Sequence, residues 1–167
     1  RYLLGCEGLD HTNGWGARRV FETVFKQYGL PRIIRTDNGA PFASHGIAGL
    51  SKLSVWFMRL GIKLERIEPG HPEQNGRHER MHLTLKEETT RPPGANILQQ
   101  QERFDRFMEE YNTGRPHEAL GMRYPSDLYL PSDQIYPKEL SELNYPLHDL
   151  TRKVNPSGHM STFKRKK

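Results

Sequence analysis

Cysteine is almost absent from this sequence of 167 residues, in which Cys6 is the only one. A single thiol excludes a disulfide within the chain and favours a reducing compartment. No apolar run approaches the roughly 20 residues of a membrane-spanning helix, and the first residues lack the pattern of a secretory signal peptide. The sequence therefore argues against a disulfide-stapled secreted domain and against a membrane protein.

Acidic residues are fewer than basic ones, with 20 Asp and Glu against 25 Lys and Arg, a net charge of +5. The isoelectric point of about 9.4 favours a polyanionic partner without proving one. Hydrophobic residues make up 34% of the chain, which is enough for one domain with a real core. We expect the closing run of four basic residues to be a solvated tail.

Helix-like and strand-like patterns alternate over the first two thirds of the chain. Helical spacing of apolar residues covers residues 16–29, 50–61, 75–90 and 97–112, and strand patterns cover residues 2–6, 32–36 and 62–67. This order predicts an α/β domain with a partly parallel sheet. From residue 124 onward prolines recur, which predicts an extended arm packed on the domain and a hairpin near residues 155–158.

Residues 78–82 read H-E-x-x-H, which on a helix places two imidazoles on one face beside a glutamate, as in zinc proteases. The motif is short, and catalytic zinc needs a third protein ligand. Neither His117 nor Glu102 lies in a recognisable ligand motif. Arg77 and Arg80 crowd the histidines and raise the electrostatic cost of holding Zn²⁺. The histidines are therefore better explained as polar helix positions.

Asp37 directly follows the strand predicted over residues 32–36, where an α/β sheet presents side chains to a ligand. Asn38 and Gly39 form a tight turn that leaves the carboxylate exposed. By itself Asp37 is an ordinary turn residue, but Glu79 follows 42 positions later (79 − 37 = 42), near the start of a helix that can lie across the strand end. Paired carboxylates are the usual ligands of Mg²⁺, and two such ions assist phosphoryl transfer.

Three motifs occur in a fixed order along the chain: TDNGAPF (residues 36–42), GHPEQNGRHER (residues 70–80) and YNTGRPH (residues 111–117). The set resembles the integrase core of DDE transposases, above all those of bacterial insertion sequences, and retroviral integrases, over roughly residues 1–130. The resemblance implies an RNase H-like, three-layer fold with a mixed sheet and flanking helices. It also implies Asp, Asp and Glu residues that bind two Mg²⁺ or Mn²⁺ ions. By motif, Asp37 is similar to the second and Glu79 to the third.

One part of the family pattern has no counterpart here. The family's first catalytic Asp lies on a strand upstream of residues 2–6, and Asp10 comes too late to fill that place, so it is better explained as a loop or helix-cap residue. We therefore expect a chain that lacks the first two strands. Its domains would be a truncated catalytic core over residues 1–123 and, over residues 124–167, the arm and the start of a small β module. Such a chain is expected to bind metal weakly and not to cleave DNA alone.

Further residues receive supporting roles. His82 and Lys86 share the helix face of Glu79 at i+3 and i+7, and Lys86 suits a DNA phosphate as well as it suits a solvated position. Arg115 and His117 follow the last helix, where a structural clasp is slightly favoured, and the Phe and Tyr stripe of that helix is expected to be core. Contacts to DNA are expected from three residues near the Glu79 helix start: Gln74, Asn75 and Arg77.

The function that the resemblance implies is DNA transposition or integration, through metal-dependent strand cleavage and strand transfer. Water would free a 3′-hydroxyl at the element end, and that hydroxyl would attack target DNA. Homo-oligomers on DNA and a cytoplasmic, nucleoid-associated place in a bacterium are implied as well. The alternative is an inactive remnant that binds DNA or a transposase protomer, with a zinc metalloprotease as a distant third.

Overall fold

The computed structural model of the chain describes residues 1–9, 14–44, 49–68, 76–140, 154 and 157, and at residue 77 the backbone alone. The structure confirms the helices predicted from the sequence, and two of the three predicted strands, to within three residues at each end. Over the described residues, none of the helices is long and apolar enough to cross a membrane. The main elements are α1 (Gly14–Tyr28), β1 (Ile33–Thr36), α2 (Lys52–Arg59), β2 (Lys63–Arg66), α3 (Gly76–Thr89) and α4 (Ile97–Glu109).

β1 and β2 form a two-stranded parallel sheet, in which Ile34 lies opposite Leu64 and Arg35 opposite Glu65. α2 forms the crossover that two consecutive parallel strands require. Because side chains alternate across a strand, Ile34 and Leu64 pack against the core. On the other face Arg35 Nη2 lies 3.2 Å from Glu65 Oε2. The sheet therefore has one face that packs on the core and one face that carries the Arg35–Glu65 pair.

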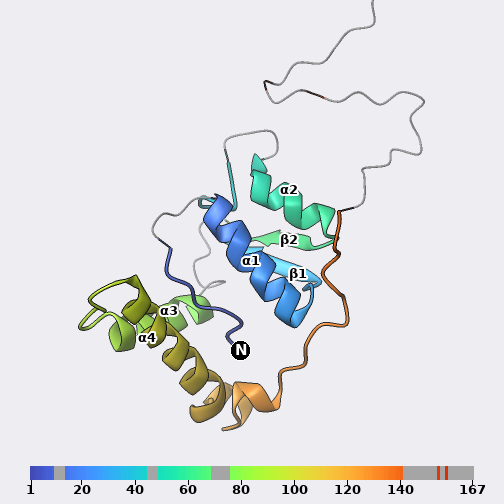
Figure 1. Cartoon of the computed structure of the whole chain (residues 1–167). Coiled ribbons are helices and arrows are strands. Elements are labelled where there is room, and N and C mark those ends of the chain that lie inside the picture. Colours follow the sequence, from blue (N-terminus) through green and yellow to red (C-terminus); the bar gives the residue numbers. More distant parts are fainter. Residues whose placement is uncertain (10–13, 45–48, 69–75, 141–153, 155–156, 158–167) are drawn as a thin grey trace, which may run out of the picture.

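α1 and α2 pack over the sheet through their aromatic side chains (Figure 1). The ring of Phe57 is fully buried and lies 4.9 Å from that of Phe21, while Phe25 stacks on Trp56 at 5.7 Å. Full burial of one such side chain stabilises a fold by roughly 2 kcal/mol, and favourable ring pairs add about 1 kcal/mol. The buried apolar side chains of this core are Ala17, Phe25, Leu30, Leu53, Trp56, Phe57, Leu60 and Ile62.

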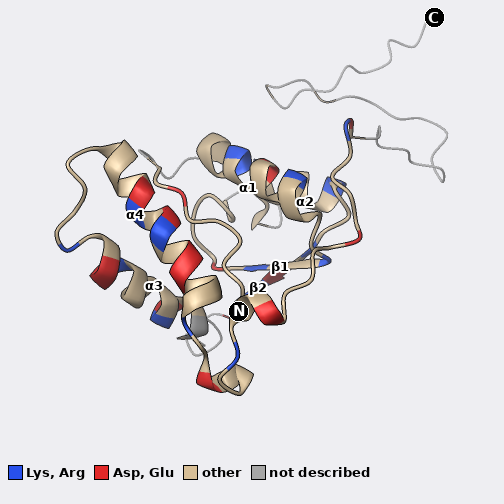
Figure 2. Ribbon diagram, turned by 60° about the horizontal axis from the view of Figure 1, so that its bottom comes forward, with Lys and Arg blue, Asp and Glu red and all other residues tan. Residues whose placement is uncertain are grey.

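α3 and α4 lie side by side as a helical hairpin (Figures 1 and 2). Asn96 caps α4 by accepting a hydrogen bond from the Gln99 amide at 3.0 Å. Gln100 fixes the connection from both sides, because its Nε2 donates to Thr89 O at 3.1 Å and its Oε1 accepts from Gly94 N at 2.8 Å. These hydrogen bonds thus fix the connection between α4 and α3, the helix that carries Glu79.

The prediction of a strand over residues 2–6 is wrong, since this segment has no strand neighbour among the described residues. Side-chain amides satisfy its backbone instead. Asn112 donates to Leu3 O at 2.9 Å and accepts from Leu3 N at 2.8 Å, and Gln101 Nε2 donates to Cys6 O at 2.9 Å. The segment is therefore attached to α4 and to the π-helical turn Glu110–Gly114 that follows it.

The α/β class is confirmed, but the sheet is smaller than the expected mixed sheet of a three-layer fold. The described residues form two strands, which are parallel to each other. β1 is half-exposed rather than buried, because exposed and partly buried residues alternate along it. One edge of each strand has no partner within this part of the chain. The sequence pattern of β1 was strong enough to predict a strand but not the number of its neighbours.

Residues 124–140 run along the domain (Figure 1). Leu30 N donates to Gln134 O at 2.7 Å, and Ser132 N donates to Tyr28 O at 3.0 Å, so this arm crosses the end of α1. Tyr136 and Leu140 pack against the core. The domain boundary at residue 123 stays a prediction. The β module and the hairpin expected further on lie almost wholly outside the described residues.

Two glycines with nearly equal φ allow a direct test of this crossing. A Cβ at Gly29 (φ +83°) would lie 2.8 Å from the carbonyl oxygens of Ser132 and Gln134, whereas one at Gly61 (φ +78°) would have no described atom within 4 Å. Gly61→Ala should lower the free energy of unfolding by about 1 kcal/mol, from backbone strain alone. Gly29→Ala should cost roughly 2 to 4 kcal/mol, because the arm must also shift. Urea unfolding measures both values, and equal losses would contradict the contact.

Candidate functional site

Asp37 stands at the carboxyl end of β1, in a turn that is bonded to the end of β2. Its Oδ1 accepts a hydrogen bond from Gly39 N at 3.1 Å, and Asn38 Nδ2 donates to Ile67 O at 2.8 Å. Asp37 is exposed. Asn38 and Gly39 therefore do hold the turn, and they leave the second oxygen of the Asp37 carboxylate without a hydrogen-bond partner among the described residues.

The chain after this turn is fixed to α2 and β2. Phe42 N donates to Gly39 O at 3.0 Å, and Ser51 Oγ donates to Phe42 O at 3.2 Å. Arg66 Nη2 donates to Gly49 O at 2.7 Å. α2 and β2 thus hold the loop that follows Asp37, so these two elements help to set the position of its backbone.

Glu79 lies in the first turn of α3 and is exposed, as are its neighbours His78 and Arg80. Ile67 and Gly76 are nine residues apart, a span that an extended chain can bridge over at most about 30 Å. The described residues contain no group of three or more His, Cys, Asp or Glu side chains that could hold a metal ion. The pairing of Glu79 with Asp37 therefore stays a prediction.

The expected DNA-contacting residues near Glu79 are described only in part. Gln74 and Asn75 lie outside the described residues, as does the side chain of Arg77. Lys86 is exposed in the last turn of α3. Asp10, expected to be a loop or helix-cap residue, also lies outside the described part of the chain.

His78 and His82 are neighbours on α3, with ring centroids 4.8 Å apart. Burial lowers the pKa of His82, and the charge on His78 lowers it further. The two rings therefore share a helix face, as H-E-x-x-H requires, but the zinc interpretation lacks a third ligand within the described residues. Two imidazoles alone do not make a catalytic zinc site.

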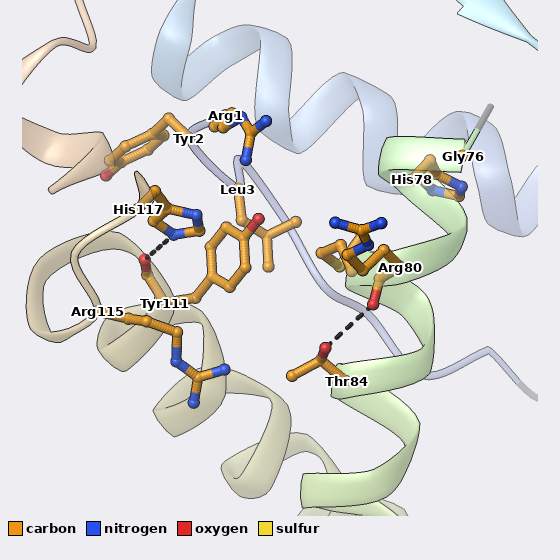
Figure 3. Close-up of a pocket in the computed structure, with 11 residues that line it drawn as sticks. Arg1, Tyr2, Leu3, Gly76, His78, Arg80, Thr84, Tyr111, Arg115 and His117 are labelled. Atoms are coloured by element: carbon orange, nitrogen blue, oxygen red, sulfur yellow. Dashed lines mark hydrogen bonds between the residues drawn. The ribbon is translucent and has the colours of Figure 1, made fainter. Parts of the chain in front are cut away.

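A cavity of about 780 Å³ lies between the N-terminal segment, the start of α3 and the end of α4 (Figure 3). Figure 3 shows the Arg80 guanidinium and the Tyr111 hydroxyl directed into this space. None of its described lining residues is acidic, so the cavity attracts anions. The lining residues that are cationic or become so on protonation are Arg1, His78, Arg80, Arg115 and His117.

Arg115 connects the end of α4 to α3. Its Nη2 lies 2.9 Å from Glu88 Oε2 and 3.2 Å from Glu110 Oε1, and the guanidinium carbon lies 5.8 Å from the centroid of the Phe107 ring. The hydrogen bond to Glu88 raises the pKa of Arg115, with a further contribution from Glu110. These contacts are those of a structural clasp, which is the role its position favoured.

His117 and Tyr111 form the opposite wall of the cavity. Their rings meet edge to face with centroids 4.7 Å apart, and His117 Nε2 lies 3.4 Å from Tyr111 O. Tyr111 is only half-buried and lines the cavity, so its assignment to the core alone is wrong. Helical periodicity could not show this, because it counts the apolar ring and not the hydroxyl at its tip.

Cys6, the single thiol of the chain, is not suited to nucleophilic chemistry. Burial, with smaller contributions from Glu7 and Asp105, raises the pKa of Cys6 to about 11. The thiol is therefore protonated at neutral pH, and a protonated thiol is a poor nucleophile and a poor metal ligand.

Part of this chain matches a recognised protein family. Residues 60–125 match the family described as integrase core domain. The chain is 35% identical to the Gag-Pol polyprotein of baboon endogenous virus (strain M7) over 75 residues, which are 45% of this chain and 4% of that protein. It is 30% identical over 120 residues to a 39.2 kDa protein of insertion element IS476 from Xanthomonas euvesicatoria, covering 71% of this chain and 33% of that protein.

A 31.7 kDa protein of insertion element IS407 from Burkholderia multivorans is 27% identical over 121 residues, which are 71% of this chain and 42% of that protein. The chain thus spans less than half the length of each of these relatives. The resemblance to integrase cores of insertion elements and retroviruses is confirmed.

The histidine pair predicts a specific titration. His82 should titrate below the ordinary value of 6.5, and His78→Asn should raise its midpoint, because one cause of the shift is removed. The unfolded chain then binds this proton more readily than the folded one, so the His82 contribution to stability falls as the pH drops below about 6.5. Proton NMR of the imidazoles measures both midpoints. An unchanged His82 midpoint in His78→Asn would contradict the proposed effect of His78 on the pKa of His82.

Proposed function

Because residues 60–125 match the integrase core domain family, we propose that this chain acts in DNA transposition or integration, through metal-dependent strand cleavage and strand transfer. One observation carries the proposal: Asp37 is held at a strand end by the Asn38–Ile67 hydrogen bond of 2.8 Å. The matched segment supplies Glu79 on the helix that follows. The β1–α2–β2 unit with α3 and α4 is proposed to be part of an RNase H-like core.

The proposed metal ligands are the carboxylates of Asp37 and Glu79, for Mg²⁺ or Mn²⁺, with two ions in the complete site. Both side chains are exposed, and carboxylate oxygens are the donors that these hard cations prefer, so the residues fit the group. When bound, such ions activate the attacking oxygen and neutralise charge on the leaving one. Gly39 N holds one oxygen of Asp37 in place, which restricts the carboxylate before any ion arrives.

The cations of the 780 Å³ cavity, apart from Arg115, which is paired with Glu88 and Glu110, are proposed to bind the DNA backbone. Arg80 directly follows Glu79 in α3, and Tyr111 adds a hydroxyl donor from the opposite wall (Figure 3). Arginine and tyrosine donors commonly contact phosphates, which position DNA without reading its sequence. Lys86 and the residues Gln74, Asn75 and Arg77 belong to the same proposed contact. We also propose that the partners are element ends and target DNA, that the chain forms homo-oligomers on DNA, and that it associates with a bacterial nucleoid.

A second candidate is an inactive remnant that binds DNA or a transposase protomer. It is favoured by the lack of a three-ligand acidic group within the described residues. Both candidates need the basic surface, and only the first needs the carboxylates. Substitutions of the two kinds of residue therefore separate them.

Asp37→Asn and Glu79→Gln test the metal site. We expect each to weaken Mn²⁺ binding at least about tenfold, since even outer-shell partners of metal ligands contribute that much. The exposed Asp133→Asn and Glu102→Gln are matched controls and should change nothing. Isothermal titration with MnCl₂ measures the affinity, and nicking of supercoiled plasmid with Mg²⁺ or Mn²⁺ measures the reaction.

Loss of nicking in the two site variants, with both controls active, supports the enzyme. A chain that binds DNA but never nicks it, with Mn²⁺ binding equal in all variants, supports the remnant. A chain that binds neither DNA nor Mn²⁺ contradicts the proposed function.

Arg80→Ala tests the cavity. The variant should bind a short DNA duplex several-fold more weakly at low salt, and the slope of log affinity against log salt should fall by about 1, because one phosphate contact is lost. Arg91→Ala is the control, since Arg91 is exposed beyond the far end of α3. Fluorescence anisotropy at several salt concentrations gives both numbers. Equal slopes for the two variants would show that Arg80 contacts no phosphate.

A further inference from the structure

Trp15 is unusually exposed for a tryptophan. It lies in the first turn of α1 and 72% of it is accessible, whereas Trp56 is 4% accessible in the core. Tryptophan is highly buried on average, and an exposed ring costs stability that a bound partner can recover. Among the described residues, the buried side chains of α1 are Ala17 and Phe25, and the Trp15 ring is not one of them.

A cavity of about 200 Å³ lies beside Trp15, between the starts of α1 and α2. Its walls are the Trp15 ring, the buried side chain of Leu53, Gly14 and two cations, Arg18 and Lys52. The space is small for a drug-sized ligand and suits one planar ring. No acidic side chain is among the described residues that line it.

The two cations differ in how they are held. The Arg18 guanidinium carbon lies 5.0 Å from the centroid of the Trp56 ring, a cation–π contact that fixes the charge at the inner wall. Lys52 is exposed at the first position of α2, next to its N-cap Ser51. One charge is therefore fixed beside the cavity, and the other is free to follow a ligand at its rim.

This cavity is connected to the turn that carries Asp37. Ser51 and Ser54, which flank Lys52 and Leu53, both donate to the carbonyl of Phe42. Phe42 N in turn donates to Gly39 O at 3.0 Å, two residues after Asp37. A ligand seated against Trp15 is thus held at the same end of the sheet as the carboxylate. Figure 1 shows the start of α1 next to the chain that follows β1.

The surrounding surface is basic. Figure 2 shows Lys and Arg along α1 and α2, with an acidic position on α1 alone. That acidic residue, Glu22, is paired with Lys26 at 2.8 Å. An exposed aromatic ring within a basic surface is the composition of single-strand nucleic-acid sites, where bases stack and cations follow the backbone. A purely apolar partner would gain nothing from Arg18 and Lys52.

We propose that the Trp15 cavity is a nucleobase-stacking site for an unpaired DNA strand, with Arg18 and Lys52 beside the flanking phosphates. This rests on the proposed function and deepens it, because it names a single-stranded segment as the part of the DNA held at the same end of the sheet as Asp37. The Trp15 ring supplies one stacking face and Leu53 closes the far side. Stacking is tolerant of sequence, since every base has a π face.

Intrinsic fluorescence tests the site directly, because the chain has two tryptophans and Trp15 is the exposed one. Titration with a 15-mer of thymidine should quench the accessible emission of the unmodified chain. Trp15→Ala should weaken binding of this oligonucleotide about tenfold, and Trp15→Phe should restore most of the affinity, because a ring still stacks. Leu98→Ala, at a side chain that is 74% exposed on α4, is the control and should bind normally.

Inorganic polyphosphate, which has charge but no bases, separates stacking from simple attraction. It should compete with the oligonucleotide without quenching Trp15. Equal affinity of Trp15→Ala and the unmodified chain for thymidine 15-mer would overturn the stacking site while leaving the proposed function intact. Quenching by polyphosphate equal to that by the oligonucleotide would overturn it as well. A chain that binds no DNA of either form would overturn both proposals.

Discussion

The parallel pairing of Ile33–Thr36 with Lys63–Arg66 is the constraint on which the rest of the structure depends. Two consecutive parallel strands need a crossover, and α2 supplies it while burying Trp56 and Phe57. Parallel pairing also puts the carboxyl ends of both strands side by side. Only then can the Asn38 amide reach the Ile67 carbonyl, at 2.8 Å. The position of Asp37 is thus a consequence of the same packing that forms the core.

Local pattern predicted the helices and two strands because each carries its own periodicity, and residues 2–6 show where such reasoning ends. Their composition permits a strand, but a strand forms only beside another one. In the structure the side-chain amides of Asn112 and Gln101 instead donate hydrogen bonds to the carbonyl oxygens of Leu3 and Cys6. No pattern in the sequence predicts that Leu3 bonds to Asn112, a residue 109 positions away. Sheet size was unpredictable for the same reason.

The candidate site divides along a similar line. Asp37 and its turn were predictable because Asp-Asn-Gly after a strand is a local signal, and Glu79 was identified by its motif. How near the two carboxylates lie is a property of the tertiary structure, so no local pattern could predict it. Trp15 was missed because the predicted helix over residues 16–29 began one residue after it, so the helical pattern gave this ring no place. Its exposure follows from how α1 meets α2, which is a property of the whole fold.

The two proposed functional surfaces would be linked by charge. A DNA strand that approaches Asp37 brings negative charge to a carboxylate, and this repulsion grows as water is excluded. Cations must offset it, and the chain supplies them on two sides, at Arg80 near Glu79 and at Arg18 and Lys52 near Trp15. A divalent ion between the carboxylates would offset the remainder. Metal and DNA would then each strengthen the binding of the other, since such coupling is reciprocal.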